Sequence, residues 1–78
     1  MITCIAIDDE PLALKQILTY IKKTPSLNLV KEFHSALKAI SFLDDTKVDL
    51  MFVDINMPDL NGLDFVRSLN NQPKVIFT

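Results

Sequence analysis

The chain has 78 residues, 49% of them hydrophobic and 23% charged, with a formal net charge of −2. This composition excludes an intrinsically disordered chain and suffices for one small domain but not two, so residues 1–78 are expected to form a single domain. The 8 basic residues are scattered and no apolar run reaches membrane-spanning length, which argues against nucleic-acid or membrane binding by this segment and for a cytoplasmic protein.

The first elements expected along the chain are a strand and a helix. Residues Ile2–Ile7 are nearly all apolar, as in a parallel strand that is buried on both faces, and Cys4 fits this run as a small buried residue. Pro11 suits the first turn of a helix. Apolar residues then recur at helical spacing until Thr24 and Pro25 end the pattern.

A second strand, a second helix and a third strand follow. Leu27–Phe33 mixes apolar and polar residues, which favours an edge strand over a central one. Ser35 is expected to cap the second helix, which ends near Asp45, and Leu50–Val53 predicts another buried strand. The apolar stripe of the second helix consists of Ala36, Ala39, Ile40 and Leu43.

The last part of the chain predicts a loop, a helix and a strand. Residues 55–62 contain Pro58 and Gly62, which are typical of a loop. A third helix is expected from its apolar face of Leu63, Val66 and Leu69, and residues 75–77 predict a fourth strand. Strands that alternate with helices indicate an α/β fold with a parallel sheet, right-handed crossovers and helices on its faces. The five phenylalanines are assigned to the core, and His34 to an exposed loop.

Acidic residues mark the carboxyl ends of two predicted strands. Asp8 and Asp9 follow the first strand, Asp54 follows the third, and Thr78 follows the fourth. Ligands of such sheets bind beyond the strand ends, so the three carboxylates are expected in one pocket. Two unit charges about 4 Å apart repel by about 1 kcal/mol in water and about 4 at an effective dielectric near 20. A divalent cation with oxygen ligands reverses this term, and Mg²⁺ is the natural candidate.

A simpler interpretation stands beside the metal site. Asp8 and Asp9 are also suited to capping the first helix through its N-terminal amides, and Asp54 is suited to beginning a turn.

These residues resemble the receiver domain of bacterial two-component response regulators. The matching segments are IDDEP at residues 7–11, FVDINMP at residues 52–58, NG at residues 61–62, and Thr78. The resemblance covers the whole chain. It implies a CheY-like, flavodoxin-like doubly wound parallel sheet, here incomplete, with strand order 2-1-3-4.

The resemblance also implies a role for each site residue. Asp54 is the phosphoacceptor, which receives a phosphoryl group from a histidine kinase or a small phosphodonor. Asp9 and Asp54 bind Mg²⁺ directly, Asp8 acts through water, and Asn56 contributes its backbone carbonyl. The hydroxyl of Thr78 contacts the phosphoryl group. Such a domain is a switch for an output module and not a turnover enzyme.

Receivers of this type continue beyond the equivalent of Thr78. The segment DDEPLAL at residues 8–14 is similar to receivers that precede a LytTR-type DNA-binding domain, so DNA contact is expected only through an output domain absent here. The lysine that receivers carry on a fifth strand is also absent, and Lys74 lies at the wrong end of the fourth strand to replace it. The exposed fourth strand is expected to support a homodimer or a swapped assembly.

Two other functions remain open at this point. A metal-dependent phosphohydrolase with an aspartyl nucleophile, similar to haloacid-dehalogenase-like enzymes, needs an acid/base two residues after the nucleophile, where this chain has Asn56. An inert dimerising fragment that keeps only the fold is the other alternative.

Overall fold

Two apolar strands form the centre of the sheet in the computed structural model, which describes residues 1–54 and 73–78. These are β1 (Ile2–Ile7) and β3 (Leu50–Val53), and the flanking strands are β2 (Leu27–Phe33) and β4 (Lys74–Phe77). The helices are α1 (Pro11–Lys22) and α2 (Ala36–Asp45). The order β2-β1-β3-β4 confirms the predicted topology, with β2 at one edge. The predicted loop at 55–62 and third helix lie outside the described residues.

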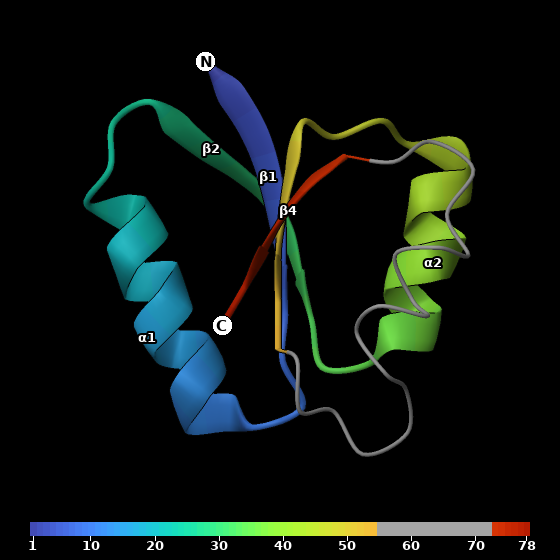
Figure 1. Cartoon of the computed structure of the whole chain (residues 1–78), viewed down its shortest axis with the longest axis horizontal. Helices are drawn as coiled ribbons and strands as arrows, with labels where there is room; N and C mark the ends of the chain where they lie inside the picture. Colours follow the sequence, from blue (N-terminus) through green and yellow to red (C-terminus); the bar gives the residue numbers. More distant parts are fainter. Residues whose placement is uncertain (55–72) are drawn as a thin grey trace.

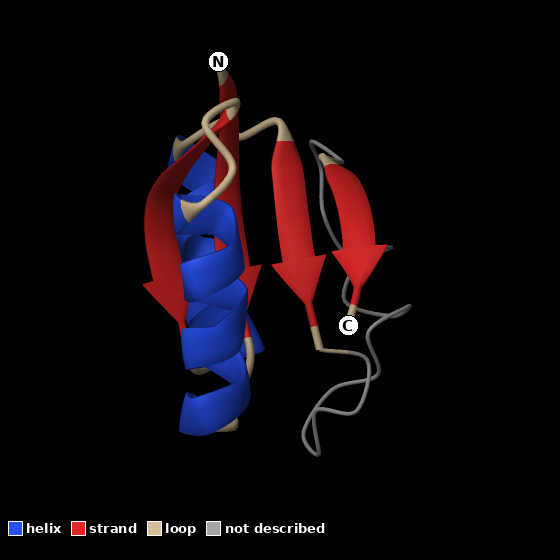
Figure 2. Cartoon of the chain, turned by 90° about the vertical axis from the view of Figure 1, so that its left-hand side faces the viewer, coloured by secondary structure: helices blue, strands red, loops and turns tan. Residues whose placement is uncertain are grey.

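All strand pairs are parallel, and the pairing of β1 differs between its two neighbours. β1 and β3 pair without interruption from Cys4↔Leu50 to Ile7↔Val53. On the other side, the register between β1 and β2 shifts between Cys4 and Ile5. β3 and β4 pair from Leu50↔Lys74 to Val53↔Phe77. Figure 2 shows the four strands running in the same direction, so their carboxyl ends share one edge of the sheet.

The sheet is covered by α1 on one face and α2 on the other (Figure 1). Because successive strand residues point to opposite faces, β1 and β3 contribute to both layers. The α1 side buries Cys4, Ala6, Leu14, Ile21 and Phe52. The α2 side buries Ile5, Ile7, Phe33, Ala36, Ala39, Leu43, Val48, Met51 and Val53. Burying each large apolar side chain contributes about 1.5–3 kcal/mol, which makes these two layers the main source of stability.

The two helix starts differ from the expected caps. α1 is capped by Glu10, whose Oε2 accepts a hydrogen bond from the Ala13 amide at 2.8 Å. Ser35 holds the cap position of α2 with an extended backbone, but its side chain makes no cap hydrogen bond. The predicted capping bond of Ser35 is therefore wrong, although the helix begins where expected. Ser35 is partly exposed, so water can satisfy the first amides of α2.

The aromatic residues are less uniformly buried than expected. Phe33 and Phe52 belong to the core, and Phe42 packs against it with its ring centroid 5.4 Å from that of Phe33. Phe77 is 37% exposed, so its assignment to the core is wrong. It lies on β4, at the edge of the described sheet, where neither α1 nor α2 covers it fully. Phe65 lies outside the described residues.

Two smaller predictions are confirmed. His34 is exposed, and Cys4 is a buried free cysteine whose thiol pKa is raised by burial. Within residues 1–54 and 73–78, no helix has the length and apolar character needed to cross a membrane.

Candidate metal centre

The register of the central strands brings two separate acidic segments together. Asp8 directly follows β1 and Asp54 directly follows β3, and the Asp54 amide donates a hydrogen bond to the Ile7 carbonyl at 3.0 Å. Asp9 begins the turn into α1. The side chains of Asp8, Asp9 and Asp54 each place one carboxylate oxygen within 4.8 Å of the others. The predicted convergence of the three carboxylates is therefore present in the structure.

The three carboxylates differ in their contact with solvent. Asp8 is buried, with 2% of its surface exposed, whereas Asp54 is partly buried and Asp9 is exposed. A buried carboxylate needs partners, because desolvation disfavours its charge. The cluster thus combines a desolvated carboxylate at Asp8 with one that is open to solvent at Asp9.

The pKa of Asp8 is raised, and the causes of the shift describe the electrostatics of the three carboxylates. Burial is the largest cause, and the charge and hydrogen bonding of Asp54 and the charge of Asp9 raise the pKa further. The Glu10 amide, which donates to Oδ1 of Asp8 at 2.9 Å, acts in the opposite direction. The raising causes prevail, so among the described residues the Glu10 amide only partly compensates an anion at Asp8.

Helix capping does not account for these aspartates. The N-cap of α1 is Glu10, and the hydrogen bond of Asp8 goes to the amide of Glu10 itself. This bond joins the end of β1 to the residue that caps α1. Sequence reasoning missed the role of Glu10. The signal was Pro11 at the first helical position, since the residue before it is then the N-cap.

Thr78 lies at the same edge of the sheet, one strand beyond Asp54. Its amide donates to the Val53 carbonyl at 2.9 Å, which continues the pairing of β4 with β3. Lys74 is at the opposite end of β4, paired with Leu50, so it does not reach this edge. Asn56, predicted to offer its carbonyl to the metal, lies outside the described residues.

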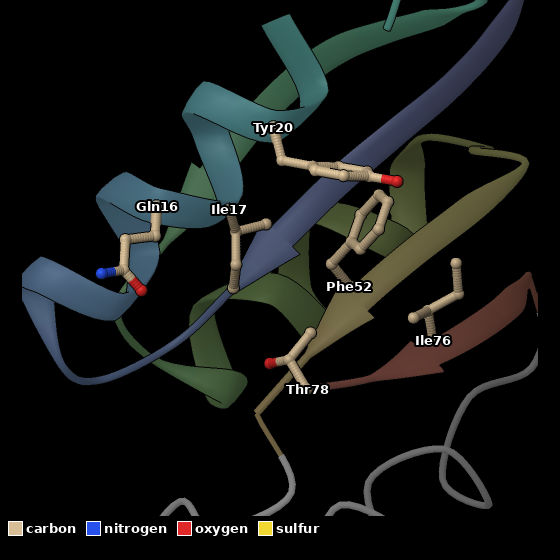
Figure 3. A pocket seen from close by; sticks show the side chains of 6 residues that line it. All are labelled: Gln16, Ile17, Tyr20, Phe52, Ile76 and Thr78. Atoms are coloured by element: carbon tan, nitrogen blue, oxygen red, sulfur yellow. The ribbon is translucent and has the colours of Figure 1, made fainter. Parts of the chain in front are cut away.

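The side chain of Thr78 also lines a largely apolar groove of about 380 Å³ (Figure 3). The groove lies between α1 and the strands β3 and β4, and sequence reasoning did not anticipate it. The groove forms because residues of α1 lie opposite β3 and β4. Helical periodicity predicts which residues share a face of α1, but it does not predict which strands that face lies against. Its other lining residues are Gln16, Ile17, Tyr20, Phe52 and Ile76.

The type and spacing of the three carboxylate oxygens suit a magnesium ion. Mg²⁺ prefers oxygen ligands at about 2.0–2.1 Å in an octahedron, which places neighbouring ligands about 3 Å apart and opposite ones about 4 Å apart. Three carboxylate oxygens within 4.8 Å of one another are close to this spacing. The residues present therefore fit a small divalent cation.

Comparison with known proteins gives one consistent result. Residues 4–78 match the family described as the response regulator receiver domain. Over 79 aligned residues the chain is 30% identical to the transcriptional regulatory protein BtsR of Escherichia coli strain K12 and 32% identical to BtsR of Salmonella typhi. Both alignments cover 99% of this chain and 33% of the relative. The chain thus spans about a third of the length of these curated relatives.

Solved structures agree with the sequence match. The response regulatory domain of mrkE from Klebsiella pneumoniae has a TM-score of 0.82 at 29% identity, covering 96% of this chain and 64% of that one. CheY6 of R. sphaeroides, solved in complex with the P1 domain of CheA3, gives a TM-score of 0.80 at 26% identity, covering 97% and 61%. The NarL receiver of Mycobacterium tuberculosis has the same fold at 22% identity, with a TM-score of 0.84 and coverage of 97% and 64%. The chain therefore belongs to the response regulator receiver domain family.

Proposed function

We propose that this receiver domain accepts a phosphoryl group on Asp54, with Mg²⁺ held by the neighbouring carboxylates. The observation that carries the proposal is the approach of oxygens from Asp8, Asp9 and Asp54 to within 4.8 Å of one another. A buried carboxylate beside two others needs a cation to offset the repulsion, and phosphoryl transfer in water commonly uses Mg²⁺.

The metal ligands are assigned from burial and from the family resemblance. Asp9 and Asp54 would hold Mg²⁺ directly, and Asp8 would act through a bound water. Asn56 would add its backbone carbonyl. When bound, Mg²⁺ neutralises charge on the transferring phosphoryl group.

Asp54 has the exposure and the chemistry of a nucleophile. Its partly buried carboxylate lies at the sheet edge, where a donor can approach. An oxygen of Asp54 attacks phosphorus and forms an O–P bond, while the bond from phosphorus to the donor breaks and its electron pair leaves with the donor atom. The hydroxyl of Thr78 would donate a hydrogen bond to a phosphoryl oxygen. One phosphoryl group per chain is the product, as in a switch that is not a turnover enzyme.

The partners of this switch are inferred from the relatives. CheY6 is recorded in complex with the P1 domain of CheA3, which supports a histidine kinase as the phosphodonor. The relatives named BtsR are transcriptional regulatory proteins about three times as long as the matched segment. We therefore propose an output module in the parent protein, of LytTR type and able to bind DNA, which reads the state of the receiver.

Acetyl phosphate labelling tests the proposal directly. With Mg²⁺, intact-mass spectrometry should show one added phosphoryl group, and omission of Mg²⁺ should prevent it. Asp54→Asn removes the nucleophile and should abolish the label. Asp45→Asn, at the exposed end of α2, is the matched control and should label normally. Equal labelling of Asp54→Asn would refute the assignment, and repeated turnover of a phosphomonoester would favour the phosphohydrolase.

A further inference from the structure

A second polar arrangement joins β1 to β3 at the end opposite the carboxylates. The Thr3 amide and the Thr3 hydroxyl both donate to Oδ2 of Asp49, at 3.0 and 3.1 Å. In return, the Asp49 amide donates to the Thr3 carbonyl at 3.0 Å and to the Thr3 hydroxyl oxygen at 3.1 Å. Thr3 and Asp49 are thus joined by reciprocal hydrogen bonds between two segments that are far apart in sequence.

Apolar burial alone does not select the pairing of these two strands. β3 consists of Leu50, Met51, Phe52 and Val53, which are apolar on both of its faces, and the part of β1 that pairs with it, Cys4 to Ile7, is apolar on both faces as well. Register is strongly specified where one face is apolar and the other polar, because a slip by one residue exchanges the faces. Here such a slip exchanges one apolar residue for another. The shift between β1 and β2 at Cys4 shows that β1 accepts irregular pairing.

Spacing along the two strands links the Thr3–Asp49 pair to the carboxylates. Asp8 lies five positions after Thr3, and Asp54 lies five positions after Asp49. Pairing Thr3 with Asp49 therefore sets Asp8 beside Asp54 at the other end. A slip by one residue would displace Asp54 along β1 by about 3.3 Å. That displacement is large compared with the 4.8 Å within which the carboxylate oxygens gather.

We propose that Thr3 and Asp49 are positioning residues for the metal site, because their hydrogen bonds select the β1–β3 register in which the three carboxylates converge. This inference rests on the proposed Mg²⁺ site. Neither residue touches the metal. They act on affinity by holding the chain in the register that can bind, and affinity falls in proportion to the fraction of chains held there.

The test is a titration with Mg²⁺ alone, followed by the NMR amide shifts of Asp8, Asp9 and Asp54. Thr3→Val keeps the shape of the side chain but removes the hydroxyl, and it should weaken Mg²⁺ binding about five- to tenfold. Thr3→Ser restores the hydroxyl and should stay within about twofold of the wild type. Asp49→Ala should resemble Thr3→Val, and Asp49→Asn, which keeps one acceptor oxygen, should be intermediate.

A control separates positioning from general loss of stability. Leu43→Ala empties a buried position on α2 without altering Thr3, Asp49 or the carboxylates, and it destabilises at least as much as loss of the hydroxyl. Its folded fraction should keep wild-type affinity. Equal weakening in Leu43→Ala and Thr3→Val, or unchanged affinity in Thr3→Val, would overturn the proposal. If Thr3→Val does not fold, Asp49→Asn and Thr3→Ser decide by the same criterion.

A second measurement tests the register role without relying on metal binding. If the wild-type chain does not bind Mg²⁺, nuclear Overhauser contacts between the Asp54 amide and Ile7 still report the register. These contacts should weaken in Thr3→Val and persist in Thr3→Ser. Their full retention in Thr3→Val would refute the register role whatever the metal does.

Discussion

The two ends of the β1–β3 pair hold aspartates in opposite electrostatic environments. Asp49 is exposed, and the Thr3 amide followed by the Thr3 hydroxyl lowers its pKa. Asp8 is buried beside Asp54 and Asp9, and burial followed by their charges raises its pKa despite the Glu10 amide. Among the described residues, Asp49 thus accepts two hydrogen bonds from Thr3, whereas Asp8 accepts one from the Glu10 amide and lies beside two other carboxylates. We therefore expect a bound cation to stabilise the Asp8 end, as the proposed Mg²⁺ site requires.

The largest expected effect on the contrast between Asp8 and Asp49 comes from adding Mg²⁺. Ligand that binds only the folded state stabilises it by about 2.7 kcal/mol at a concentration one hundred times the Kd. Thermal unfolding followed by circular dichroism should therefore show a clear rise in Tm with Mg²⁺. Na⁺ at equal ionic strength is the control. An equal rise with both salts would indicate screening alone.

Replacing the buried carboxylate should remove most of that gain. Asp8→Asn is close to isosteric, and loss of an outer partner of a metal site typically costs about 10–100-fold in affinity. Without metal, the same variant should be more stable than the wild type at neutral pH, because a desolvated repulsive charge is gone. Isothermal titration and urea denaturation measure the two effects. Asp44→Asn, on α2, should change neither.

The pH dependence of stability should have opposite signs at the two ends. The raised folded pKa of Asp8 gives stability that is present below its unfolded value, about 3.9, and is lost as pH rises through the folded value. The lowered pKa of Asp49 gives stability that is present above about 3.9 and is lost as pH falls through the folded value. Urea midpoints across a pH series, without metal, measure both.

Variants assign each part of the pH profile to its residue. Asp8→Asn should remove the loss of stability on the alkaline side of the unfolded pKa, and Asp49→Asn should reduce the loss on the acid side. The Asp49 effect should be the smaller one, because that group is fully exposed to solvent. Unchanged profiles in both variants would contradict the assignment.

The exposed edge of the sheet at β4 could pair with a second copy of the chain. β4 is an edge of the described sheet, with Ile76 44% and Phe77 37% exposed, so we expect weak association through it. Light scattering should show mass rising with concentration, and Ile76→Lys should reduce the rise. Leu37→Lys, on α2, is the exposed apolar control. A strictly monomeric wild type at high concentration would contradict this expectation.

Much of the fold was predictable because local patterns and parallel topology agree. The bounds of β1 and β2 are those that the sequence predicts, and the convergence of Asp8, Asp9 and Asp54 follows from their places after adjacent strands. That inference needed only the rule that parallel strands end at one edge.

The features that could not be predicted depend on contacts that a local sequence pattern does not specify. Ser35 has the right residue type for a cap, but its side chain makes no cap hydrogen bond with α2. At α1 the capping bond is made by Glu10, which the sequence pattern did not single out. Phe77 is apolar, but its burial is decided by what covers β4. The hydrogen bonds of Asp49 depend on its register with Thr3, which the local sequence pattern does not specify. The ligand role of Asn56 and the phosphoacceptor role of Asp54 stay predictions.

The hydrogen bond between Asp8 and the Glu10 amide has a consequence for communication within the domain. Asp8 belongs to the carboxylate cluster, and Glu10 caps the first turn of α1 by accepting a hydrogen bond from the Ala13 amide. A cation that draws electron density from Asp8 would weaken its hold on the Glu10 amide. The first turn of α1 would then respond to a cation bound at the carboxylates.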